Sequence, residues 1–146
     1  MMKSQVARMS FHAILIGLML TAASNWIVVA EVEYTPLTKA DRKTAISADL
    51  FIVYGFSERP TMGTVVLKIQ VFDKAGNKVT PVTIQGRSGM PSMRGAHDSE
   101  PVDFKLNRKN DYLLPVDIVM PGDWEVQLTF MKDGKAIFFG RINFDV

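Results

Sequence analysis

The chain has 146 residues, which is enough for one domain with a hydrophobic core but too few for two domains of ordinary size. It has no cysteine, so disulfide bonds, thiolate metal sites and thiol-based catalysis are excluded. Two of the 17 basic residues, Lys3 and Arg8, lie near the N-terminus, and the other 15 balance the 15 acidic residues of positions 31–146. A neutral domain lacks the basic surface that nucleic-acid binding requires, so no nucleic-acid partner is expected.

The first 30 residues have the pattern of a targeting segment. Lys3 and Arg8 precede an almost uncharged apolar run over residues 11–30, and acidic residues begin at Glu31. This asymmetry predicts a cytoplasmic N-terminus and an extracytoplasmic location, in the periplasm or cell envelope, for the remainder. Small residues near position 22 and at Ala30 suit cleavage of a signal peptide, whereas the run is also long enough for a retained membrane anchor. Both fates stay open.

The pattern changes twice after the targeting segment. Residues 31–46 are polar without a sustained period and are predicted to form a linker. Residues 47–146 alternate with a period of two in about seven segments and show no helical stripe, so they are predicted to form one all-β domain. The side chains expected to face its core are Val65, Leu67, Ile69 and Val71; Val102, Phe104 and Leu106; Leu114, Val116, Ile118 and Met120; Trp124, Val126, Leu128 and Phe130; and Phe138, Ile142, Phe144 and Val146.

Two turns indicate how the strands connect. Asp133-Gly134 suits a type I′ turn, so the last two strands are predicted to form a tight hairpin. Pro121-Gly122 favours a type II turn, whose twist splays the flanking strands and suits a passage from one sheet to another. Seven short strands with one hairpin and one arch predict an immunoglobulin-like β-sandwich. This architecture hosts many unrelated functions and does not by itself indicate one.

The stretch GMPSMRGAHDSE, residues 89–100, places methionines in a segment whose glycines and proline indicate a loop. Met90, Met93 and His97 offer thioether and imidazole groups, which are ligands that soft Cu(I) prefers. The alternative is that both methionines pack over Trp124 at the open end of the sandwich, with His97 in solvent. The serines near His97 lack the spaced base and orienting group that a nucleophilic enzyme needs, so no enzymatic activity is expected.

Three quoted motifs carry a resemblance to a known family: GTVVLKIQVFDKAGNKV, then MPSM in a loop, then YLLPVDIVMPGDWEVQLTF. Over about residues 60–146 the chain resembles the YtkA-like family of small extracytoplasmic domains, which is related to the FixH proteins linked to copper-dependent oxidase assembly. The resemblance implies an N-terminal signal or anchor, copper handling, and a copper-trafficking or membrane partner protein. Family members often carry a histidine directly after the methionine motif, whereas here Arg94, Gly95 and Ala96 precede His97.

Two functional hypotheses follow from the residues and the resemblance. In the first, the domain holds Cu(I) through Met90, Met93 and His97 and passes it to a partner. In the second, the same methionines form an adaptable apolar contact surface on a metal-free protein-interaction module.

Overall fold

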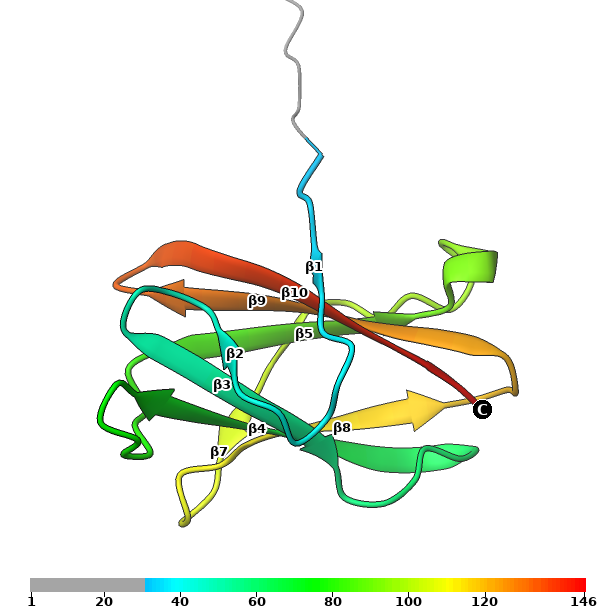
Figure 1. Cartoon of the computed structure of the whole chain (residues 1–146). Coiled ribbons are helices and arrows are strands. Elements are labelled where there is room, and N and C mark those ends of the chain that lie inside the picture. The colour runs from blue at the N-terminus through cyan, green and yellow to red at the C-terminus, as the bar shows by residue number, and fades with distance from the viewer. Residues whose placement is uncertain (1–30) are drawn as a thin grey trace, which may run out of the picture. The chain divides into compact units, whose positions relative to one another are not determined.

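The computed structural model describes residues 31–146, which form two five-stranded β-sheets in two layers (Figure 1). Only one short 3₁₀ helix interrupts the strands of this part of the chain. The prediction of an all-β sandwich is therefore confirmed. The targeting segment predicted for residues 1–30 lies outside the described residues. No helix within residues 31–146 has the length and hydropathy of a membrane span.

The first sheet, sheet A, forms the upper layer in Figure 1. Its strands are antiparallel except for a parallel pair at one edge, where the chain enters the fold beside its last strand. In spatial order they are β1 (Thr35–Pro36), β10 (Lys135–Asp145), β9 (Asp123–Lys132), β5 (Thr83–Gly89) and β6 (Val102–Asp103).

The second sheet, sheet B, forms the lower layer and is antiparallel throughout. Its strands in spatial order are β2 (Thr44–Ala45), β3 (Leu50–Phe56), β4 (Gly63–Asp73), β8 (Tyr112–Ile118) and β7 (Lys105–Leu106). Six of the ten strands in the described residues have seven or more residues, and the other four are two-residue edge strands. The predicted number of about seven is close to the number of long strands.

The side chains between the sheets follow the predicted alternation in the longest strands. On β4, Val65, Leu67, Ile69 and Val71 are at most 2% exposed. On β9 the core-facing side chains are equally buried, and they are Trp124, Val126, Leu128 and Phe130. These two rows come from different sheets, so their burial removes both apolar faces from water and holds the layers together.

The segment predicted as a linker, residues 31–46, contributes one short strand to each sheet. β1 and β2 both lie within residues 31–46, and Leu37 and Ile46 are each only 4% exposed. β1 pairs with β10 on sheet A, and β2 pairs with β3 on sheet B. Two-residue strands are too short to show a period, which is why this polar stretch resembles a linker in sequence.

The strand predicted over residues 102–106 is wrong as a single strand. Val102 and Leu106 are 49% and 50% exposed, and only Phe104 between them is buried. β6 pairs with β5 of sheet A, whereas β7 pairs with β8 of sheet B, so the chain changes sheets at Phe104. The rotation of the backbone at this crossing breaks the alternation.

Two further rows of predicted core residues are confirmed only in part, because some of their residues are only half-buried. On β10, Ile142 is buried, whereas Phe138 and Phe144 are partly exposed, as is Val146 directly after the strand. The pairing of β10 with β9 is irregular between Ala136 and Phe138. Met120, beyond the end of β8, is likewise only partly buried.

Both predicted turns take the expected paths. Asp133 and Gly134 both have positive φ, 51° and 75°, as a type I′ turn requires, and they join β9 to β10. At Pro121-Gly122 the chain passes from β8 in sheet B to β9 in sheet A, and Gly122 has a φ of 137°. The Gly122 amide also donates to the Val146 carbonyl (2.9 Å), which ties the C-terminal residue to this turn.

Candidate functional site

The methionine loop, residues 90–101, connects β5 to β6 and carries the 3₁₀ helix Pro91–Met93, the green coil at the upper right of Figure 1. Pro91 is the first residue of this helix, where its fixed φ is favourable. The Met93 amide donates to the Met90 carbonyl (2.9 Å), and the Ala96 amide donates to the Met93 carbonyl (3.1 Å). Two consecutive tight turns therefore give the loop a defined backbone.

The structure separates the three predicted copper ligands by environment. Met90 is 3% exposed and belongs to the core, where its Cε would lie 2.8 Å from a Cβ added to Gly122. Met93, three residues later, is 41% exposed. His97 is half-buried and lines a cavity of about 370 Å³ with Trp124, a cavity that neither methionine lines. The two methionines are thus close in the backbone, whereas His97 faces a different space.

The loop is tied to sheet A by side-chain contacts to three carboxylates. Arg94 Nη2 donates to Glu125 Oε1 (2.7 Å), and the Ser92 amide donates to Asp123 Oδ2 (3.0 Å). The Ser92 hydroxyl donates to the other Asp123 oxygen. These hydrogen bonds from Ser92 lower the pKa of Asp123, and the Glu125 carboxylate raises the pKa of Arg94.

The third carboxylate, Asp98, belongs to the loop itself. Its Oδ2 accepts from Arg87 Nη2 on β5 (3.3 Å) and from the Gly95 amide (3.2 Å). Its Oδ1 is buried without a hydrogen-bond partner in the described residues, and it occupies the space where a Gly89 side chain would begin. Gly89 is therefore required for the loop to close over the end of β5.

Glu125 is the site residue that the sequence pattern misses. It alternates with the core residues Trp124 and Val126 and so belongs to the outer face of sheet A, yet it is only 2% exposed. Besides Arg94, it accepts from Gln127 Nε2 (2.8 Å) and from Asn143 Nδ2 (3.4 Å). A buried carboxylate is costly unless it is paired and hydrogen-bonded, and here the loop arginine supplies the charge.

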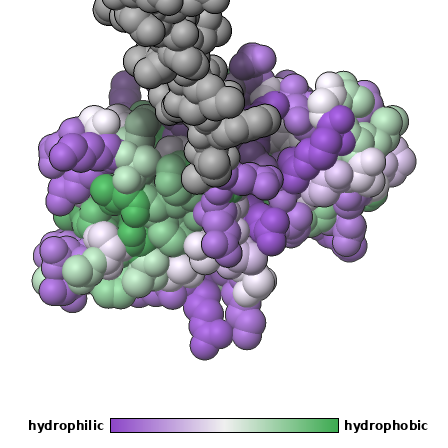
Figure 2. All heavy atoms as spheres, turned by 90° about the horizontal axis from the view of Figure 1, so that it is seen from above, coloured by the Kyte–Doolittle hydropathy of each residue, from purple (hydrophilic) through white to green (hydrophobic). Residues whose placement is uncertain are grey.

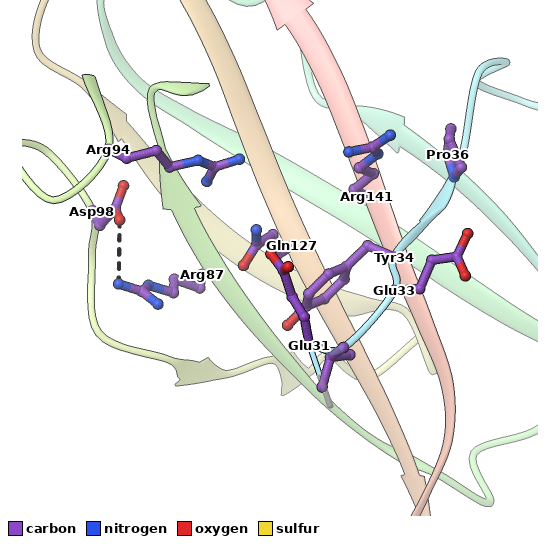
Figure 3. Close-up of a pocket in the computed structure, with 10 residues that line it drawn as sticks. Glu31, Glu33, Tyr34, Pro36, Arg87, Arg94, Asp98, Gln127 and Arg141 are labelled. Carbon is purple, nitrogen blue, oxygen red and sulfur yellow. Dashed lines mark hydrogen bonds and ion pairs between the residues drawn. The ribbon is translucent and has the colours of Figure 1, made fainter. Parts of the chain in front are cut away.

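A polar groove of about 750 Å³ lies beside this carboxylate on the outer face of sheet A (Figure 3). Arg87, Gln127 and Arg141 stand directly opposite one another on β5, β9 and β10 and form a row across the floor. Arg94 and Asp98 of the loop line one side, and residues 31–36 line the other.

Figure 2 looks down onto this layer. Hydrophilic residues dominate much of the visible surface. Hydrophobic residues gather toward the end of the molecule where the turn between β9 and β10 lies. The groove is lined mainly by charged and polar residues, so it differs in character from this apolar end.

No three His, Cys, Asp or Glu residues in the described part of the chain lie close enough together to hold a metal ion. That result concerns neither methionine sulfur nor Cu(I), and the copper assignment of Met90, Met93 and His97 stays a prediction. Comparison of the chain with protein-family models, with curated proteins and with solved structures finds no match.

Proposed function

We propose that this protein is a non-enzymatic extracytoplasmic binding domain, in which an immunoglobulin-like sandwich presents a methionine-rich rim to a protein partner. The rim consists of the exposed Met62, Met93 and Val119, with the half-buried Met120 next to Val119 in the chain. The motif resemblance to YtkA-like and FixH-related domains and the pattern of the first 30 residues support the location and the class. The exposure of the rim is the observation that carries the function.

Six large hydrophobic side chains in the described residues are exposed, and three of them belong to the rim. Met62 and Val119 are each 60% exposed, and Met93 is 41% exposed. Met62 directly precedes Gly63, which pairs with Ile118 at the end of β8, and Val119 follows Ile118. Ser92 contacts Asp123 at the start of β9, so the methionine loop reaches the same end of the sandwich (Figure 1).

An exposed group of this kind suits a contact with another protein. Apolar side chains that gather at one place on a soluble domain mark interaction sites more often than isolated ones do. Methionine is unbranched and polarizable, so a methionine-rich surface can adapt to a partner at little steric cost.

Cu(I) handling is the second candidate, and one observation favours it. A single tight turn, closed by the hydrogen bond from the Met93 amide to the Met90 carbonyl, brings the two methionines close together along the backbone. However, Met90 fills the core at 3% exposure, so metal binding by Met90 requires the loop to move. For that reason we place the metal-free module first.

The experiment that separates the two candidates combines a metal titration with cross-linking. The protein is titrated anaerobically with Cu(I) against a chromogenic chelator, as wild type and as the Met90→Leu/Met93→Leu variant. Leucine keeps the volume and costs under about 1.5 kcal/mol of stability, so the variant stays folded. For a metal-free module, both proteins leave the copper with the chelator. Tight binding by wild type that is lost in the variant would instead establish the copper function.

A photoreactive amino acid placed at Met62 or Met93 in the native host tests the rim directly. We expect a discrete cross-linked partner from both positions. The matched control is Lys74, which is exposed in the turn after β4, at the opposite end of that strand from Met62. Equal cross-linking from Lys74, or none from the rim, would contradict the interaction module.

A further inference from the structure

The outer face of sheet A carries a second feature, separate from the rim: a set of cationic and amide donors directed at one groove. Gln127 lies between Arg87 and Arg141 in a straight row across three strands. Adjacent strands are about 4.8 Å apart, so the two arginine backbones lie about 10 Å from each other. Arg94 reaches the same groove from the methionine loop (Figure 3).

The three arginines differ in how much of their donor capacity is used. Arg87 donates to Asp98 and, through Nε, to the Ser99 carbonyl (3.0 Å), so it is engaged with the loop. Arg94 uses one nitrogen on Glu125, and its side chain stays 49% exposed. Arg141 is exposed, and the structure gives its side chain no hydrogen bond or ion pair within residues 31–146. A guanidinium has five N–H donors, so Arg94 and Arg141 retain most of theirs.

Glu125 holds this donor set in place. Its carboxylate accepts from Arg94 and from Gln127, which orients one arginine and the central amide from beneath the groove. Arg94 therefore presents its remaining donors at a fixed position and is not a freely moving surface side chain. Donors positioned in advance bind a ligand more tightly because less conformational entropy is lost on binding.

The opposite wall of the groove contains an acidic segment of the chain. Residues 35–36 pair with β10, and the Tyr34 ring packs edge-on against Phe139 with 5.8 Å between ring centres. These contacts fix residues 31–34 along the groove. Figure 3 shows the Glu31 carboxylate directed toward Gln127, whereas the Glu33 carboxylate points away from Arg87 and Arg94. The chain thus places one of its own carboxylates in the groove.

We propose that this groove is a carboxylate-binding site, formed by Arg94, Gln127 and Arg141, and that Glu31 competes there with an external carboxylate. Planar guanidinium groups bind carboxylates in two-point geometry, which suits an acidic side chain or a peptide C-terminus. The site lies on the outer face of sheet A, and its assignment does not depend on the rim.

The test uses two short peptides with the full-length protein, followed by nitrogen–proton NMR. Acetyl-Glu-Glu-Glu-amide carries only side-chain carboxylates, and acetyl-Gly-Gly-Gly carries only a terminal carboxylate, so their relative affinities identify the source. Acetyl-Gln-Gln-Gln-amide is the neutral control. We expect shifts of the Gln127 side-chain amide with at least one acidic peptide and none with the neutral one.

Three variants test whether peptide binding depends on the groove and not on the net charge of the protein. Arg141→Gln is expected to weaken peptide binding about tenfold, since it removes charged hydrogen bonds to the ligand. Glu31→Gln is expected to strengthen binding several-fold because it removes the competing carboxylate. Arg108→Gln changes the net charge by the same amount at an exposed residue between β7 and β8, and it is expected to leave the affinity unchanged.

Two results would overturn the proposal. One is the absence of any shift with both acidic peptides, in wild type and in Glu31→Gln. The other is an equal loss of affinity in Arg108→Gln and Arg141→Gln, which would show a general charge effect. Neither result bears on cross-linking at the rim, so the two proposals fail independently.

Discussion

Two buried carboxylates, one next to each sheet, make similar hydrogen bonds but have different roles in the protein. Asp111, directly before β8, is 6% exposed, and Glu125 on β9 is 2% exposed. Both accept hydrogen bonds from a cationic side chain at 2.7 Å, Lys78 for Asp111 and Arg94 for Glu125. They differ in whether the hydrogen-bond network around the carboxylate is closed, with its donors held by other residues, or open toward a groove.

The Asp111 network is closed. Oδ1 accepts from Gln70 Nε2 (2.6 Å) as well as from Lys78, and Oδ2 accepts from Asn107 Nδ2 (3.2 Å). The Asp111 amide donates back to Asn107 Oδ1 (2.9 Å), so the carboxylate joins β4 to the turn before β8. Burial alone would raise the pKa of Asp111, but the hydrogen bonds from Lys78, Gln70 and Asn107 outweigh it and lower the pKa to about 2.

The Glu125 network is open on one side. Its cation, Arg94, is 49% exposed and lies on a loop, and the groove above it contains unused donors. Lys78, by comparison, is 29% exposed and also donates to the Lys109 carbonyl (3.2 Å). A closed network of this kind serves stability, whereas an open one beside a groove is available to a ligand. Three predictions test this contrast, from the largest expected effect to the smallest.

Removal of the Asp111 side chain should cause the largest loss of stability. Asp111→Ala leaves Gln70, Asn107 and Lys78 without their common acceptor, and we expect the free energy of unfolding to fall by about 2–3 kcal/mol. Denaturant unfolding at pH 7 measures the change. The matched control is Asp117→Ala on β8, where an exposed carboxylate accepts only from Thr64 (2.6 Å) and the loss should be under about 1 kcal/mol. Equal losses would show that the closed network adds nothing.

Acid should remove the contribution of Asp111 selectively. Its pKa is about 2 in the folded protein and 3.8 for the unperturbed carboxyl group, so the folded state favours the ionised form. The resulting stabilisation is complete above about pH 4 and is lost as the pH falls toward 2. It amounts to about 2 kcal/mol. The free energy of unfolding of wild type and of Asp111→Asn, measured from pH 7 to pH 2, should converge over that window. A constant difference would refute the closed-network interpretation.

Neutralisation of Glu125 should have the smallest effect on global stability. In Glu125→Gln the amide oxygen still accepts from Arg94, whose half-exposed charge is solvated by water, so we expect a change within about 1 kcal/mol. The methionine loop should nevertheless loosen, because the charge that holds Arg94 is gone. Faster hydrogen exchange at the amides of Met93 and Ala96, which close the two turns of the loop, would show this. A stability loss as large as that of Asp111→Asn would remove the distinction between the two networks.

Part of the candidate site could be predicted from the sequence. The glycines and proline of residues 89–100 predict a loop, and the structure has one with a short 3₁₀ helix. The pattern cannot separate Met90, in the core, from Met93, which is 41% exposed, because both are equally apolar. Their difference depends on Gly122, which leaves room for the Met90 side chain and lies 32 positions further along the chain.

The copper assignment and the family resemblance stay predictions, as do the targeting segment and the extracytoplasmic location. The groove could not be predicted at all, since Arg87, Gln127 and Arg141 are each ordinary outward-facing residues of an alternating strand.

The sequence by itself determined the long strands, the inward faces of β4 and β9 and the two turns, because pleating and turn geometry are local properties of the chain. β4 and β9 bury their predicted rows, and the Asp133-Gly134 and Pro121-Gly122 turns connect the predicted partners. Only the tertiary structure decided which residues cover the outward-facing Glu125 of sheet A. Arg94 and Glu125 are 31 positions apart, and their contact exists because β5 and β9 are neighbours in sheet A. Long-range pairing of this kind leaves no periodic trace, so the buried carboxylate and its groove emerge only from the fold.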